Sequence, residues 1–155
     1  MKAISTAGFA LAILCGVLAT ASQAAEIRGL GNKCLDVTEG NSADGTPVIL
    51  YQCKGRGDNA NQQWTIANGE IRGLGNKCLD VAQGDSANGT PVILFRCKGP
   101  GANANQRWSI SNGEIRGLGN KCLDVTQGSS ADGTRIILYQ CKGRGDNANQ
   151  LWSIR

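Results

Sequence analysis

The sequence predicts an all-β protein, a β-trefoil of three repeats with about twelve strands. Three observations carry this prediction. The segment EIRGLGNKCLDV occurs at residues 26–37, 70–81 and 114–125, with a period of 44 residues. The tryptophans and six of the seven cysteines keep the same period. Within one period the strand signals are short and bounded by turns, and no useful stretch shows helical periodicity.

The repeats occupy residues 26–69, 70–113 and 114–155. Residues 26–67 and 114–155 differ at only seven of 42 positions. By length, residues 25–155 are expected to form a single domain.

Each repeat is expected to hold four strands. In the first repeat they are residues 27–30, 34–37, 48–53 and 62–66, separated by turns and polar loops rich in glycine. Propellers usually need four or more blades, so three four-stranded units fit a pseudo-threefold β-trefoil better. Closure around that axis also removes the exposed sheet edges that an open array would leave.

The alternation of side chains along a strand predicts which residues face the core. The expected core set of the first repeat is Leu35, Val37, Val48 and Leu50, together with Trp64 and Ile66. On this reading Asp36 and Tyr51 both face away from the core.

Residues 1–24 are predicted to be a secretory signal peptide. Lys2 is the only charged residue before Glu26, residues 9–18 are apolar, and small residues follow. Cleavage is expected after Ala24, with Ala21 as the second choice. The apolar run is shorter than the roughly 20 residues that span a bilayer, so no membrane span is expected. The protein is therefore predicted to be secreted, to the extracellular space or the periplasm.

Composition excludes several functions for the exported chain. Without Lys2 the net charge falls from +4 to +3, which is too weak and dispersed for a nucleic-acid-binding protein. The chain has no histidine, the commonest general base and metal ligand. Six cysteines remain after export, an even number that indicates three disulfides. No Cys-x-x-Cys pair supports the rival zinc site, so neither a metal nor a cofactor is expected.

Three motifs in each repeat resemble those of the ricin B-type lectin family. In the first repeat they are Cys-Leu-Asp-Val, then Gly-Thr-Pro-Val-Ile-Leu-Tyr-Gln-Cys, then Asn-Gln-x-Trp. The Gln-x-Trp signature stands at residues 62–64, 106–108 and 150–152. The resemblance covers nearly all of the exported chain. It implies a carbohydrate-binding β-trefoil without catalysis, similar to a bacterial-style stand-alone lectin or carbohydrate-binding module.

The same resemblance implies one disulfide in each repeat. Six cysteines allow fifteen pairings, and the 44-residue period favours the same bond in every repeat. The implied pairs are Cys34–Cys53, Cys78–Cys97 and Cys122–Cys141.

By resemblance, each repeat can hold one shallow sugar site. An aspartate would accept hydrogen bonds from sugar hydroxyls, an aromatic ring would stack on a sugar face, and an asparagine would add a polar contact. A glutamine would support the site more often than touch the ligand. The implied residues are Asp36, Tyr51, Asn61 and Gln62; Asp80, Phe95, Asn105 and Gln106; Asp124, Tyr139, Asn149 and Gln150. No catalytic residue is expected.

Two departures from the family pattern bear on specificity. Some galactose-binding members carry a polar residue two places before the aromatic, where this chain has Ile49, Ile93 and Ile137. Galactose-type sugars thus stay one option among glycans and polysaccharides. Phe95 replaces tyrosine in the middle repeat, which makes that site the expected weaker member.

The sequence is also compatible with other functions. The aspartates could cap turns. The trefoil could be a protease inhibitor or a protein-interaction scaffold, although no loop differs enough from its copies to be singled out. It could also target a toxin or a glycosidase as a subunit, with a partner that the chain does not encode. A glycosidase would need two carboxylates in one cleft, whereas the acids here recur with the repeat.

Overall fold

The computed structural model describes residues 23–55, 59–99, 104–143 and 145–155. Nearly all of the predicted signal peptide, residues 1–24, lies outside the described residues. Among the described residues there is no helix with the length and apolar character needed to span a bilayer.

Twelve strands fall into three sets of four within the described residues. The first repeat contains β1 (Ile27–Arg28), β2 (Cys34–Val37), β3 (Thr46–Tyr51) and β4 (Thr65–Ala67). The second contains β5 (Glu70–Arg72), β6 (Cys78–Val81), β7 (Thr90–Phe95) and β8 (Ser109–Ser111). The third contains β9 (Glu114–Arg116), β10 (Cys122–Val125), β11 (Thr134–Tyr139) and β12 (Ser153–Ile154). The predicted all-β architecture of three four-stranded repeats is confirmed.

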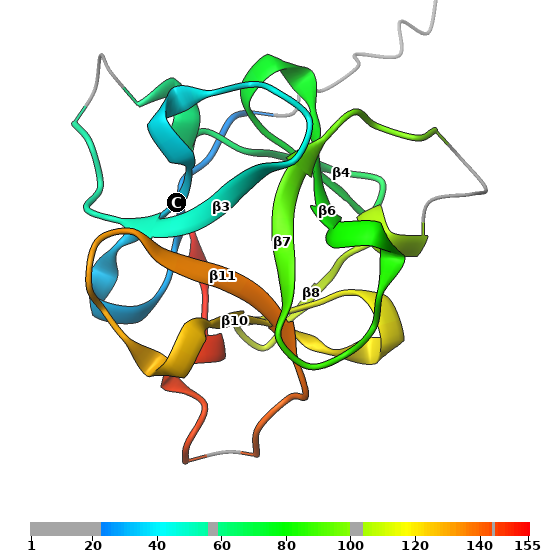
Figure 1. The fold of residues 1–155 in the computed structure, drawn as a ribbon. Helices are drawn as coiled ribbons and strands as arrows, with labels where there is room; N and C mark the ends of the chain where they lie inside the picture. Colours follow the sequence, from blue (N-terminus) through cyan, green and yellow to red (C-terminus); the bar gives the residue numbers. More distant parts are fainter. Residues whose placement is uncertain (1–22, 56–58, 100–103, 144) are drawn as a thin grey trace, which may run out of the picture.

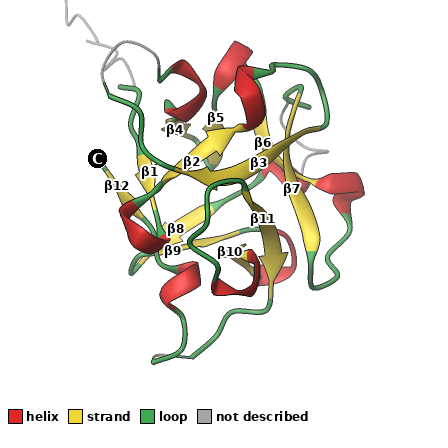
Figure 2. Ribbon diagram, turned by 60° about the vertical axis from the view of Figure 1, so that its left-hand side comes forward, coloured by secondary structure: helices red, strands yellow, loops and turns green. Residues whose placement is uncertain are grey.

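Within each repeat, single 3-10 turns connect successive strands (Figure 2). They are η1 (Leu30–Asn32), η2 (Thr38–Gly40) and η3 (Ala60–Gln62); η4 (Leu74–Asn76), η5 (Ala82–Gly84) and η6 (Ala104–Gln106); η7 (Leu118–Asn120), η8 (Thr126–Gly128) and η9 (Ala148–Gln150). The prediction had placed Leu30 and Gln62 in strands. Both lie in these turns instead, since the left-handed conformation of Gly31 ends one strand early and Gln62 turns inward before β4 begins.

The longest strand of each repeat lies nearest the pseudo-threefold axis. Strands β3, β7 and β11 pair with one another in all three combinations, and Figure 1 shows them surrounding the centre of the molecule. Each also pairs along its length with the second strand of its own repeat. Strand β12 pairs with β1, so the two ends of the domain close on each other.

The core confirms the predicted alternation, except that Ile66 is only partly buried against it. In the first repeat Leu35 pairs with Leu50 and Val37 with Val48, and all four side chains are fully buried. The same positions of the other repeats join them in one hydrophobic cluster. Asp36 pairs with Ile49, and Cys34 with Tyr51, on the opposite face of the same hairpin. This opposite face carries the candidate site.

The tryptophans are core residues, as predicted, and they join successive repeats. The indole Nε1 of Trp64 donates a hydrogen bond to the carbonyl of Leu35 at 3.0 Å. Its ring lies against Gly73 of the next repeat, where a Cβ atom would approach Trp64 Cζ3 to 2.6 Å. Only glycine leaves room for such a close approach. Gly117 and Trp108, and Gly29 and Trp152, repeat this contact around the axis.

The three disulfides have the pairing that the family resemblance implied. They join Cys34 to Cys53, Cys78 to Cys97 and Cys122 to Cys141. Among the described residues, two groups of one glutamate and two cysteines lie close enough together to suggest metal ligands. Their sulfur atoms are bonded to each other, so they cannot act as the thiolate ligands that zinc requires.

Candidate functional site

A buried carboxylate lies at the centre of each repeat. In the first repeat β2 places Asp36 on the face opposite the hydrophobic core, and the turn η3 covers it. Only 2% of Asp36 is exposed. The sequence predicted the direction of this side chain but not its burial.

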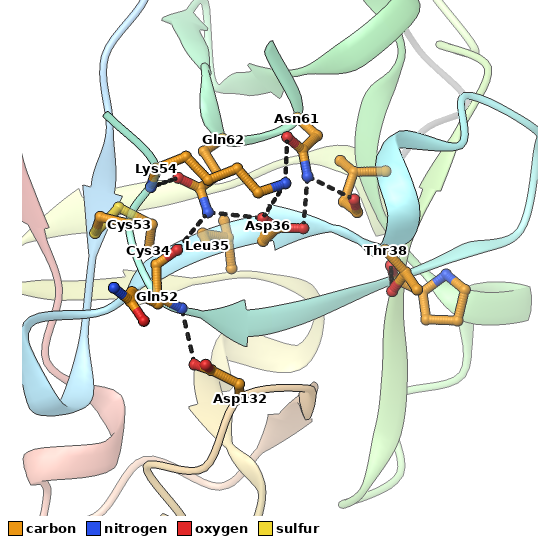
Figure 3. A network of polar contacts seen from close by, with 12 residues as sticks. Cys34, Leu35, Asp36, Thr38, Gln52, Cys53, Lys54, Asn61, Gln62 and Asp132 are labelled. Carbon is orange, nitrogen blue, oxygen red and sulfur yellow. Dashed lines mark hydrogen bonds and ion pairs between the residues drawn. A yellow bond between two sulfur atoms is a disulfide. The ribbon is translucent and has the colours of Figure 1, made fainter. Parts of the chain in front are cut away.

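The turn η3 supplies hydrogen-bond donors to both carboxylate oxygens (Figure 3). The amide of Asn61 donates to Asp36 Oδ1 at 2.8 Å, and that of Gln62 donates to Asp36 Oδ2 at 2.7 Å. Gln62 also donates to the carbonyl of Gln52 and accepts from the backbone N–H of Lys54. Together these bonds hold the carboxylate in one orientation.

The other two repeats keep this arrangement. Gln106 and Gln150 donate to Asp80 and Asp124 at 2.6 and 2.7 Å. Asn105 donates to Asp80 Oδ1 at 2.7 Å. No buried side-chain nitrogen or oxygen lacks a partner among the described residues. Each repeat therefore presents one rigid, fully supported acceptor group.

Burial changes the acidity of two of these carboxylates. It raises the pKa of Asp36 and of Asp124 above the ordinary value of 3.8, because the charged form loses hydration. The hydrogen bonds from Gln62 and Gln150 favour the charged form and offset part of the rise.

An aromatic ring borders each carboxylate on the solvent side. Tyr51 and Tyr139 end β3 and β11 and are 39% and 38% exposed. Phe95, at the same position of β7, is half-buried. Such rings can pack against the C–H face of a sugar.

A lysine that is not among the predicted site residues completes the polar side of the site. Lys54 Nζ donates to Asn61 Oδ1 at 3.0 Å and lies 3.6 Å from Asp36 Oδ2 and 5.8 Å from the centre of the Tyr51 ring. Of its equivalents, Lys98 lies 3.2 Å from Asp80 Oδ2 and 5.2 Å from the centre of the Phe95 ring, and Lys142 donates to Asn149 Oδ1 at 3.0 Å. The signal was present in the sequence, since a lysine follows the second cysteine in every repeat.

A solvent-accessible cavity lies over the carboxylate in every repeat. The cavity of the first repeat, about 370 Å³, is lined by Asp36, Thr38, Glu39, Ile49, Tyr51 and Lys54. That of the third, about 270 Å³, is lined by Asp124, Thr126, Gln127, Ile137, Tyr139 and Lys142. That of the middle repeat, about 500 Å³, includes Asp80, Gln83, Ile93, Phe95 and Lys98. We name them the first, middle and third cavities.

The predicted site residues divide into two layers. The aspartates and aromatics line the cavities. The asparagines and glutamines lie behind the aspartates, buried and bonded to them or to nearby backbone. The asparagines were expected to add a polar contact to the ligand. In the structure their side-chain amides donate to the buried aspartate or to a neighbouring backbone carbonyl.

One further residue lines each cavity from a strained backbone position. It is the middle residue of η2, η5 and η8: Glu39, Gln83 and Gln127, whose φ angles are 55°, 58° and 56°. Left-handed conformations are uncommon for residues other than glycine, and they often mark functional sites. Nothing in the sequence predicted this left-handed conformation.

The chemistry available in each cavity is recognition of hydroxyl-rich ligands. The carboxylate oxygens accept hydrogen bonds, the lysine ammonium donates them, and the aromatic ring offers an apolar surface. The carboxylate and the lysine are held by neighbours before a ligand arrives, which lowers the entropic cost of binding.

A comparison of the chain with family models finds the ricin-type beta-trefoil lectin domain, matched over residues 23–112 and again over residues 67–155. Among curated proteins no sequence matches significantly.

Solved structures show the same fold. A designed threefold-symmetric protein, ThreeFoil, superposes with a TM-score of 0.72 at 27% identity, over 84% of this chain and 96% of its own. The agglutinin from Abrus precatorius gives 0.73 at 26% identity, over 90% of this chain and 51% of its own. The C-half of an earthworm R-type lectin, solved in complex with GalNAc, superposes with a TM-score of 0.70 at 24% identity, over 86% of this chain and 98% of its own.

Proposed function

We propose, from the premise that this chain belongs to the ricin-type β-trefoil lectin family, that it is a secreted lectin with up to three shallow sugar sites. The observation that carries the proposal is the cavity that recurs in every repeat. Each combines a fixed carboxylate, a lysine and an aromatic ring on one solvent-facing surface. Three such sites on one rigid domain can engage a dense glycan surface together, with an avidity gain of roughly 10²–10⁴-fold.

Binding without hydrolysis is part of the proposal. In the middle and third cavities a single carboxylate is present, whereas glycosidases use two. The first cavity adds Glu39 to Asp36, so release of free sugar from bound oligosaccharides is to be measured alongside binding. If the protein hydrolyses a bound oligosaccharide and Glu39→Gln abolishes that hydrolysis, the proposal that the protein binds sugars without catalysis is wrong.

The aromatic rings that line the three cavities give the sharpest test. Tyr51→Ala, Phe95→Ala and Tyr139→Ala combined should abolish signal on a broad glycan array and leave the unfolding midpoint nearly unchanged. Leu151→Ala is the matched control, because Leu151 is 40% exposed and lines none of the three cavities. An unmodified protein that binds no glycan, or a triple variant that still binds fully, contradicts the proposal.

Export is tested separately. The chain expressed in a secreting host should appear outside the cytoplasm with an intact mass that begins at Ala25 and corresponds to three disulfides. A product that retains residues 1–24 would remove secretion from the proposed function without affecting sugar binding.

A further inference from the structure

The three cavities share a buried aspartate and a lysine but differ in the charges around them. The first cavity adds Glu39, and the third has the neutral Gln127 at that position. The middle cavity has the neutral Gln83 there and gains Arg135, which comes from another repeat.

Arg135 reaches the middle cavity because of its place near the pseudo-threefold axis. It is the second residue of β11, where β3 and β7 carry Pro47 and Pro91. These three positions, together with the core residues Val48, Val92 and Ile136, line the inner end of the middle cavity. The outer end holds Asp80, Phe95 and Lys98, so one continuous space joins the carboxylate site to the axis.

The guanidinium of Arg135 is available to a ligand. Arg135 is exposed, and its side chain makes no hydrogen bond or ion pair with any described residue. A planar guanidinium with free donors matches the geometry of a carboxylate, which it can bind through two parallel hydrogen bonds.

The balance of charge therefore differs in sign between two cavities of one molecule. The first is lined by two carboxylates and one ammonium group. The middle one is lined by one carboxylate, one ammonium and one guanidinium. In the third a single carboxylate faces a single ammonium. A ligand with a negative charge meets attraction in the middle cavity and repulsion in the first.

We propose that the middle cavity binds acidic glycans, in which a sugar carboxylate contacts Arg135, and that the first cavity selects neutral ones. This inference rests on the proposed lectin function and gives it two specificities. The size of the middle cavity supports an extended ligand, since about 500 Å³ lies within the range of roughly 300–1,000 Å³ typical of ligand sites.

The test isolates one cavity at a time. Tyr51→Ala with Tyr139→Ala leaves the middle cavity intact, and Phe95→Ala with Tyr139→Ala leaves the first. Both variants are applied to an array of matched pairs, uronic-acid-containing oligosaccharides and the same oligosaccharides with each carboxyl group reduced to the alcohol. The middle-cavity variant should prefer the acidic partner by about tenfold, the effect of one favourable charge contact, and the first-cavity variant should prefer the neutral partner.

Arg135→Pro in the middle-cavity variant should remove the acidic preference. Proline is compatible with this strand position, because the other two repeats have it there. Arg135→Gln removes the charge without changing the backbone and should act in the same way. Arg155→Ala is the control, because it removes the same single positive charge from a residue that lines none of the three cavities. Alanine is compatible with this position, since the first repeat has Ala67 there.

The outcomes separate this inference from the lectin proposal. An unmodified protein that binds neither member of any pair contradicts both. Binding without an acidic preference in the middle-cavity variant, or a preference that survives Arg135→Pro and Arg135→Gln, overturns the inference and leaves the lectin function standing. A preference lost equally in Arg155→Ala would show an effect of net charge and also overturn it.

Discussion

Each repeat has a buried part and an exposed rim, and the two parts differ in how closely the repeats match. The buried part, which holds the tryptophan, the glutamine and the aspartate, is the same in all three repeats except at one core position, where Val48 and Val92 correspond to Ile136. The rim varies at the residues that line the cavities, as at Glu39, Phe95 and Arg135. The buried part thus sets the shape of a cavity, and under the proposed function the rim sets what that cavity binds. Substitutions should obey this division, with effects on stability in one part and on selectivity in the other.

The largest effect is expected from the buried glutamine. Gln62→Leu removes two donors and one acceptor from the interior: those that serve Asp36, the Gln52 carbonyl and the Lys54 N–H. Buried polar groups without partners lose their hydration without compensation. The free energy of unfolding, measured by urea denaturation, should fall by about 3 kcal/mol.

The adjacent glutamine is the matched control. Gln63 is only half-buried, and the third repeat has Leu151 at the same position. Gln63→Leu should change the free energy of unfolding by about 0.5 kcal/mol or less, as surface substitutions do. Equal losses from the two variants would contradict the division into a buried part and a rim.

The sequence predicted the core and the direction of the site residues because both follow from local alternation. Leu35 and Asp36 are neighbours in a strand, so one must face the core and the other must not. The 44-residue period then extended the assignment to all three repeats. The aspartates and aromatics that line the cavities were found in this way, helped by the family resemblance.

Contacts between distant segments could not be predicted in the same way. Asp36 is covered by residues 25 and 26 positions further along the chain, in a turn that the sequence reading had partly placed in a strand. The approach of Arg135 to the cavity of Asp80 depends on how the third repeat closes around the axis. No spacing within one repeat encodes either contact.

The second prediction concerns acidity and distinguishes the carboxylates of the two parts. Burial raises the pKa of Asp36 and Asp124, so these groups take up a proton at a pH above 3.8. Protonation removes the charge and one acceptor site from the first and third cavities. Sugar binding at these two sites should therefore decline on acidification while the pH is still above 3.8, as followed by titration calorimetry with a Phe95→Ala variant.

The carboxylates on the rim have pKa values that are shifted in the opposite direction. Asp44 and Asp132 each accept a hydrogen bond from a lysine of another repeat, Lys77 or Lys33, which lowers their pKa. Their contribution to stability is present above pH 3.8 and is lost only as the pH falls through the lowered values. The raised pKa values of Asp36 and Asp124 have the opposite effect on stability. The native state holds their protons more tightly than the unfolded chain does, so the stability of the protein falls as the pH rises from 3.8 through the raised values.

Carbon-detected NMR titration can follow all four groups in one sample. The carboxyl carbons of Asp36 and Asp124 should titrate above 3.8, and those of Asp44 and Asp132 below it. The same midpoint for all four groups would contradict the assignment of the shifts to burial in one part and to ion pairing in the other.

The smallest effect is expected at the junction between the second and third repeats. Lys33 contacts Asp132 and Lys77 contacts Asp44, each at 2.7 Å, but the corresponding Lys121 donates to the backbone carbonyl of Ser86. The reason is Asn88, which occupies the position of the two aspartates and accepts a hydrogen bond from the Gln140 N–H.

Asn88→Asp should recreate the ion pair of the other junctions and keep the hydrogen bond from Gln140, since a carboxylate oxygen also accepts. Exposed ion pairs contribute little and are screened by salt. The unfolding midpoint should rise slightly at low ionic strength, and the rise should vanish at about 1 M salt, where screening acts within roughly 3 Å. Asp132→Asn is the reverse change and should lower the midpoint by a similar amount. Because neither residue lines one of the three cavities, glycan selectivity should stay the same in both variants; a change in it would show that the junctions help to set the shape of the cavities.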